Sequence, residues 1–179
     1  MTKTATHSLT YVAIGAALIA VLSQITIPIG PVPFTLQTLA IGLLATLYKP
    51  KEATLSVIFY LLLGGIGLPV FAGFSGGFSG LLGPTAGFLW GFILYAAMTS
   101  TISKPYSPPA QIFLACLIGT LACFIVGILA FKLISGANWA DSLAWTVLPF
   151  ILPELVKMMV IVILVRTLQP ILKKEAYFA

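Results

Sequence analysis

The residues with the clearest capacity for chemistry are Glu154 and Lys157, which lie three positions apart in an otherwise apolar run. On an α-helix this spacing places both side chains on one face, about one turn apart, where they can interact. Pro153 suits the first turn of such a helix. A carboxylate beside an ammonium group presents an acceptor next to a donor, which fits a small polar ligand with adjacent N–H and C=O groups. The alternative is an ion pair that neutralises itself and only packs the protein.

The composition of the chain indicates that this pair lies in a membrane protein. Of 179 residues, 60% are hydrophobic and 7% are charged, and the mean hydropathy is +1.12. Globular domains are roughly one quarter charged, and a soluble domain of this size cannot hide so much apolar surface. These values exclude an aqueous enzyme, a nucleic-acid binder and a disordered segment. Charged side chains inside membrane helices are rare and by default mark function.

Other motifs that could support catalysis or metal binding are incomplete. The segment 73–77 matches the G-x-S-x-G pattern around Ser75, but a nucleophilic serine there needs a strand–turn–helix setting and a histidine partner. The single histidine, His7, is expected on the cytoplasmic side. Cys116 and Cys123 are expected to be small packing residues on one helix face. We therefore expect no catalytic residue, no metal ligand and no cofactor.

Apolar runs that stop at proline, glycine or charged residues predict the elements that position these side chains. The fold expected is an all-α membrane protein, a bundle of six transmembrane helices within one membrane domain, residues 1–179. The first apolar run lacks the cleavage site of a signal peptide and is predicted as a helix. The six helices are predicted at 8–27, 34–48, 53–66, 84–102, 110–134 and 149–172.

The placement of the basic residues predicts the orientation of this bundle. Lysine and arginine are enriched in cytoplasmic loops, so both termini are expected in the cytoplasm. The proline-rich segment after the first helix, the glycine-rich segment and the start of the sixth helix would then share the outer face. The outer side would carry only Lys132 and Asp141, whereas the cytoplasmic side would carry Lys3, Lys49, Lys51, Lys104, Lys173 and Lys174.

The glycine-rich segment and other parts of the chain hold the residues expected around a ligand. The segment 64–80 is rich in glycine and contains three phenylalanines. Glycine permits close backbone approach, so this segment can cover a pocket, although a plain flexible connection is the alternative. The candidate aromatic walls are Phe34, Tyr60, Phe71, Phe74 and Trp90. The other candidate ligand-binding residues are Thr35, Gln37, Ser75, Gly76, Gly77 and Thr85.

Small residues spaced four apart predict close helix contacts. Small residues at this spacing in the fourth helix (Gly83, Gly87 and Gly91) and in the fifth (Gly119, Cys123 and Gly127) are expected to pack these helices within the bundle. In the first helix the pairs Ala13/Ala17 and Ala16/Ala20 have the same spacing. Either pair could face a separate subunit, and the spacing does not choose between the two registers.

Three segments together resemble a known family. They are VPFTLQTL at 32–39, GLPVFAG at 67–73 and GPTAGF at 83–88, and they resemble the BioY-type biotin transporters, the substrate-binding S components of bacterial energy-coupling factor (ECF) uptake systems. The resemblance extends over nearly the whole chain. It implies a six-helix protein of the bacterial plasma membrane that holds biotin near the outer face. Its implied partners are a transmembrane coupling subunit and two cytoplasmic ATPases, with no nucleic acid.

The resemblance also implies roles for individual residues. The family's acidic-x-x-Lys pair falls on Glu154 and Lys157, with glutamate where many relatives have aspartate, and the docking surface for the coupling subunit falls on Ala13 to Ala20. The ureido ring of biotin offers N–H groups and a C=O that match the pair, but Lys157 could instead meet the valerate carboxylate. The remaining alternatives are an S component for another vitamin, a structural membrane subunit without a ligand, and a small intramembrane enzyme.

Overall fold

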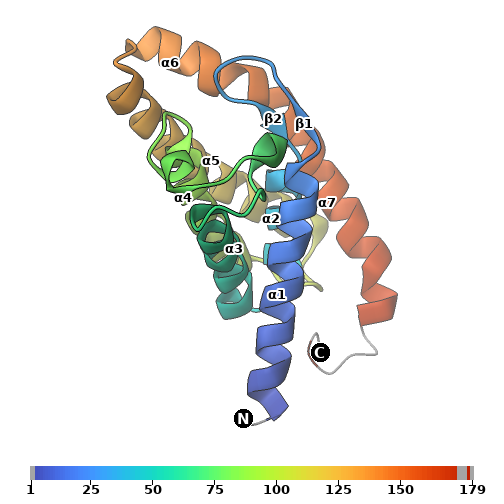
Figure 1. Ribbon diagram of the computed structural model, residues 1–179. Coiled ribbons are helices and arrows are strands. Elements are labelled where there is room, and N and C mark those ends of the chain that lie inside the picture. The colour runs from blue at the N-terminus through green and yellow to red at the C-terminus, as the bar shows by residue number, and fades with distance from the viewer. Residues whose placement is uncertain (1–2, 173–176, 178–179) are drawn as a thin grey trace.

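The computed structural model describes residues 3–172 and residue 177, with the backbone alone for 3–6. The chain is almost entirely helical in these ranges (Figure 1). The helices are α1 (Lys3–Ser23), α2 (Gln37–Leu47), α3 (Pro50–Gly65), α4 (Ala86–Ile102), α5 (Pro109–Ser135), α6 (Trp139–Thr146) and α7 (Ile151–Leu172). The short elements are β1 (Thr26–Ile27), β2 (Phe34–Thr35) and the 3-10 turns η1 (Ala72–Phe74), η2 (Phe78–Leu81) and η3 (Leu148–Phe150).

All six predicted helices are present, and the predicted all-α class is confirmed. The first differs at its end, because residues predicted as helix form the small antiparallel ladder of β1 with β2. Thr26 pairs with Thr35, and Ile27 pairs with Phe34. Three prolines lie between the two strands, and a proline provides no N–H for a helical hydrogen bond. As a result α1 ends at Ser23 and α2 begins only at Gln37.

The short helix α6 is the element that the hydropathy pattern missed. It begins at an N-cap in which the Asn138 side chain accepts a hydrogen bond from the Asp141 backbone N–H at 2.8 Å, a favoured arrangement at a helix start. Its outer side exposes Trp139, Leu143 and Trp145. In Figure 1, α6 lies across the end of the bundle near the β1–β2 hairpin, above the core that the other helices enclose.

Glycine contacts hold α4 against α5, which confirms that the small residues of both helices pack within the bundle. A Cβ atom added at Gly91 would lie 2.9 Å from the Cys123 sulfur, and one added at Gly127 would overlap the Phe88 ring. A Cβ atom added at Gly87 would overlap the Cβ atom of Ala130. Backbones at such distances leave room for no larger residue, so these glycines fix how the two helices cross.

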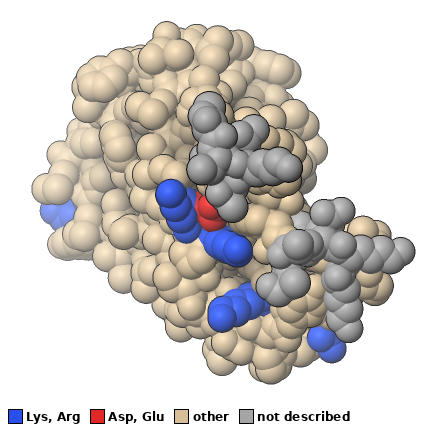
Figure 2. Space-filling model, turned by 90° about the horizontal axis from the view of Figure 1, so that it is seen from below, with Lys and Arg blue, Asp and Glu red and all other residues tan. Residues whose placement is uncertain are grey.

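The start of α1 and the end of α7 lie at one end of the bundle, opposite α6 (Figure 1). Viewed from that end, basic side chains are prominent and one acidic group is visible (Figure 2). Lys49, Lys51 and Lys104 are exposed, whereas Lys173 and Lys174 lie outside the described residues, as does the side chain of Lys3. This distribution agrees with the one used to predict the orientation.

The exterior of the bundle is apolar. Large exposed side chains include Ile14 and Val21 on α1, Ile125 on α5 and Met159 and Ile163 on α7. Two segments, Pro109–Ser135 and Trp139–Leu172, are long and apolar enough by themselves to cross a bilayer, and the other apolar helices are shorter. An apolar exterior of this kind is stable in lipid and unstable in water.

Candidate ligand-binding site

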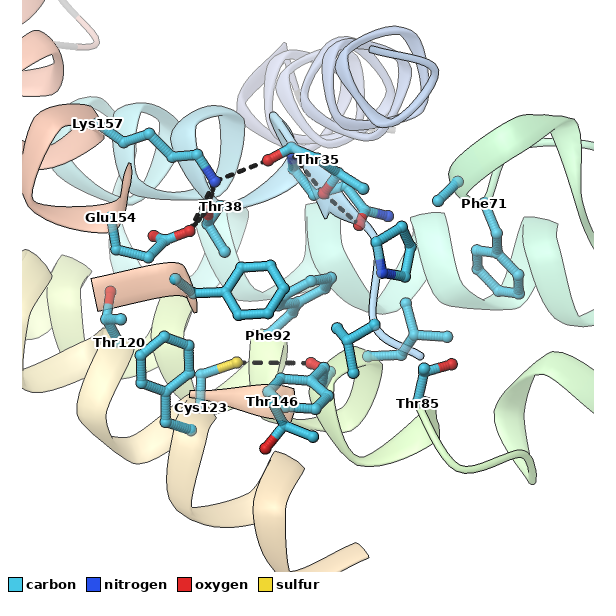
Figure 3. Close-up of a pocket in the computed structure, with 18 of the residues that line it drawn as sticks. Thr35, Thr38, Phe71, Thr85, Phe92, Thr120, Cys123, Thr146, Glu154 and Lys157 are labelled. Atoms are coloured by element: carbon cyan, nitrogen blue, oxygen red, sulfur yellow. Dashed lines mark hydrogen bonds and ion pairs between the residues drawn. The ribbon is translucent and has the colours of Figure 1, made fainter. Parts of the chain in front are cut away.

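A cavity of about 190 Å³ lies between α2, α4, α5 and α7, next to the glycine-rich segment (Figure 3). Its walls are mostly apolar, with a few polar groups, which is the usual composition of a small-molecule site. Its lining residues are Val32, Pro33, Thr35, Gln37, Thr38, Phe71, Ala72, Ser75, Gly80, Thr85, Phe88, Leu89, Phe92, Thr120, Cys123, Phe124, Thr146, Phe150, Glu154 and Lys157.

The Glu154–Lys157 pair forms the charged part of this wall. The Lys157 Nζ lies 2.6 Å from Glu154 Oε1, and the two residues are only 5% and 4% exposed. Both side chains project from the first two turns of α7, as the three-residue spacing predicts. Taking two charges out of water is costly unless further hydrogen bonds satisfy them, so the groups around the pair are informative.

Those further hydrogen bonds come from the end of β2 and the start of α2. Lys157 Nζ donates to the Thr35 carbonyl oxygen at 2.7 Å and to Thr38 Oγ1 at 2.8 Å, in addition to Glu154. Thr38 Oγ1 in turn donates to Glu154 Oε1 at 2.7 Å. The three protons of the ammonium group therefore meet three acceptors, and the Phe34 ring lies 4.3 Å from the same nitrogen. We call Thr35, Thr38, Glu154 and Lys157 the polar cluster.

Thr35 is positioned by a second chain of buried hydrogen bonds. Its hydroxyl donates to Gln37 Oε1 at 2.9 Å, and Gln37 Nε2 donates to the Tyr60 hydroxyl at 2.6 Å. Tyr60 is fully buried and packs edge-on against Phe71, with ring centroids 5.6 Å apart. Tyr60 therefore does not line the cavity; it supports Gln37 and Phe71, which do.

The glycine-rich segment is an ordered cover and not a plain flexible connection. Phe71 is buried, and its ring packs where a Cβ atom at Gly64 would lie. The Phe71 N–H donates to the Ser75 carbonyl at 2.9 Å. Gln24, just after α1, accepts from the Phe74 N–H at 2.8 Å, and Ser23 Oγ donates to the Val70 carbonyl at 2.6 Å. The end of α1 thus holds this segment over the cavity.

The structure brings seven of the predicted ligand-binding residues to the cavity and leaves six outside its lining. Phe74 is 70% exposed. Trp90 is also exposed, and its indole N–H donates to the Leu81 carbonyl at 3.1 Å. The Phe34 ring packs against the Lys157 ammonium group and is not part of the lining. The seven in the lining are Thr35, Gln37, Phe71, Ser75, Thr85, Glu154 and Lys157; the six outside it are Phe34, Tyr60, Phe74, Gly76, Gly77 and Trp90.

Sequence reasoning missed Thr38 and most of the aromatic wall. Thr38 lies three positions after Thr35 within the predicted helix 34–48, but the sequence carries no signal that brings it to Lys157. Thr120 and Thr146 lie singly in apolar helices and carry no such signal. The Thr120 hydroxyl is buried without a hydrogen-bond partner among the described residues. The missed wall residues are Phe88, Leu89, Phe92, Phe124 and Phe150.

The two small-residue pairs of α1 differ in exposure. Ala16 is only 1% exposed and belongs to the core, and Ala20 is half-buried against it. Ala13 and Ala17 are exposed. Only the Ala13/Ala17 register therefore offers small side chains at the surface, next to the exposed Ile14.

Known proteins resemble this chain over most of its length. The model of the BioY family matches residues 1–174. The biotin transporter BioY2 of Lactococcus lactis subsp. cremoris is 40% identical over 164 residues, 91% of this chain and 90% of that protein. A probable biotin transporter BioY of Pyrococcus horikoshii is 39% identical over 158 residues, 88% and 93% of the two chains. The crystal structure of the S-component for biotin from an ECF-type ABC transporter superposes with a TM-score of 0.86 at 30% identity, covering 99% of this chain and 96% of that one. The chain belongs to the BioY family.

Proposed function

We propose that this chain is the S component that captures biotin for an ECF transporter, acting as a single membrane domain without catalysis. The observation that carries the proposal is the buried polar cluster at one side of an otherwise apolar cavity. Biotin has matching parts: a polar ureido ring fused to an apolar thiophane ring with an aliphatic chain. The names of the relatives, which are biotin transporters, favour biotin over another vitamin.

In the proposed complex the ureido ring lies against the polar cluster. Within the described residues, both hydrogen bonds that Glu154 accepts end on Oε1, which leaves Oε2 to accept from a ureido N–H. The ureido oxygen would accept from Lys157 or from Thr38 in place of one of the hydrogen bonds that these side chains donate within the cluster. A charge-assisted hydrogen bond of this kind is stronger than a neutral one. Phe71, Phe92 and Phe124 supply apolar surface for the remaining atoms of the ligand.

The proposed orientation places both termini in the cytoplasm, all six predicted helices across the membrane and the glycine-rich segment on the outer side. Basic residues at the end of the bundle that holds the start of α1 support it, because cytoplasmic ends are rich in lysine and arginine. Energy would come from two separate ATPases through a transmembrane coupling subunit. The exposed Ala13/Ala17 surface of α1 is the proposed docking site for that subunit.

Direct binding measurements test this function. The chain purified in detergent is expected to bind biotin at one site per chain in isothermal titration calorimetry, and to give no heat with thiamine or riboflavin. Thermal melting and size-exclusion chromatography show whether the sample is folded and monodisperse. A folded, monodisperse sample without biotin binding would refute the proposal, and binding of another vitamin would reassign the substrate.

A further inference from the structure

We infer that the site recognises the bicyclic head of its ligand and does not recognise the negative charge of its tail. Biotin derivatives with a neutral tail, such as the methyl ester and the primary amide, are therefore ligands of the same site with affinities close to that of biotin. The inference rests on the proposed function and defines the class of molecules that the cavity accepts.

The charges around the cavity are the first step. Of the described residues that line it, Glu154 and Lys157 alone carry charge. They are in direct contact at 2.6 Å, so they compensate each other. The Lys157 ammonium group has three protons, and all three are donated: to Thr35, to Thr38 and to Glu154, at 2.6 to 2.8 Å. Any ligand group that accepts from Lys157 must therefore replace one of these three acceptors.

The second step is what a carboxylate would encounter beside Lys157. It would lie next to Glu154 as well, and two carboxylates would then share one ammonium group in a buried site. A like charge at this distance disfavours ionisation, and an uncompensated buried charge is strongly destabilising. A ureido oxygen is neutral and adds no net charge to the polar cluster. The neutral head therefore binds at this side, and the tail extends away from it.

The third step is the opposite side of the cavity, where the tail must lie. In Figure 3, Thr85 and Phe71 lie across the cavity from Glu154 and Lys157. Ser75 and Gly80 of the lining lie next to Phe71, and none of these residues is charged. The Ser75 hydroxyl already donates to the Ala72 carbonyl at 2.8 Å. A hydroxyl such as that of Thr85 can donate to a carboxylate, an ester carbonyl or an amide carbonyl.

Lys132 lies in the last turn of α5, and it is the basic residue that could contradict this inference by binding the carboxylate of the tail. Its side chain is half-buried, and its ammonium group lies over the Trp139 ring, 4.9 Å from the centroid. It is not part of the cavity lining. A role for Lys132 in binding the tail is therefore an outcome that the experiment must detect.

The test compares four ligands on the purified full-length chain by calorimetry. They are biotin, biotin methyl ester, biotinamide and, as the matched control for the head, biotin methyl ester blocked at a ureido nitrogen by a methoxycarbonyl group. The ester and the amide are expected to bind within tenfold of biotin. The blocked ester, which differs from the ester only at the head, is expected to bind at least a hundredfold more weakly than the ester.

Two results separate this inference from the proposed function. If biotin itself does not bind, the proposed function fails and the inference fails with it. If biotin binds and the ester and amide bind tenfold or more weakly, the function stands and the inference is wrong. The variant Lys132→Gln is expected to leave the ratio of biotin to ester affinity unchanged. A large loss of biotin affinity alone in that variant would show that Lys132 reads the carboxylate.

Discussion

A double-mutant cycle at Glu154 and Lys157 can separate a binding role of this pair from a packing role. Glu154→Gln keeps the shape of the side chain and an acceptor for Thr38 but removes the charge. Lys157→Met keeps a long apolar side chain and leaves Glu154 buried beside one hydroxyl, that of Thr38. Because both residues are at most 5% exposed, each single variant has an uncompensated buried charge. We therefore expect both single variants to melt at lower temperature than the wild type.

The magnitudes follow from the burial of the pair and its contacts. Breaking one partner of a buried pair costs about 3–5 kcal/mol, whereas replacing both can be nearly neutral. The double variant should therefore recover much of the melting temperature. Ligand binding should not recover, because each side chain would lose its own hydrogen bond to biotin. At about 1–3 kcal/mol per bond, the loss is roughly 5- to 150-fold for each residue.

The wild type, the two single variants and the double variant are compared in detergent. Calorimetry measures their affinity for biotin, and thermal melting measures their stability. The expected outcome is a double variant that is more stable than either single variant and binds biotin no better than the weaker one. A double variant that binds biotin like the wild type would refute the reasoning. The pair would then be structural, and the polar contacts of the ligand would have to come from Thr35, Gln37 and the glycine-rich segment.

Three further predictions concern docking, the cover of the site and orientation. Ala17→Trp is expected to leave biotin binding intact but to abolish ATP-driven uptake of labelled biotin with the partner subunits. The reason is that the Ala17 side chain is exposed and docking needs close approach of the helices. The control Ala16→Trp, at a core position, should instead lower the melting temperature. Gly64→Ala should displace Phe71, because the added Cβ overlaps its ring. If the displaced ring can no longer contact the ligand, biotin binding should weaken by roughly 5- to 150-fold, the equivalent of an overpacking cost of about 1–3 kcal/mol. Unchanged affinity would show that this ring does not contact the ligand. With both native cysteines replaced, a cysteine at Ser79 should react with an impermeant thiol reagent only from outside and one at Ser107 only from the cytoplasm, and the reverse pattern would overturn the orientation.

Local sequence determined the parts of this protein that depend on near neighbours. Six apolar runs separated by proline, glycine and charge were enough to predict the six long helices. Glu154 and Lys157 are neighbours because residues three positions apart lie on the same face of a helix. In the structure their charged groups are in contact. The four-residue spacing of small residues predicts close helix packing, but the pairing of α4 with α5 is seen only in the structure.

The tertiary structure alone decided which side of each helix faces the cavity. In a soluble protein an apolar stripe marks the buried side of a helix, but lipid is as apolar as the core, so these helices are hydrophobic all round. The sequence therefore could not show that Trp90 and Phe74 face outward, that Tyr60 is a support, or that Ala17 is exposed where Ala16 is buried. It also could not place Thr38 against Lys157, 119 positions away, because that contact depends on how α2 and α7 pack.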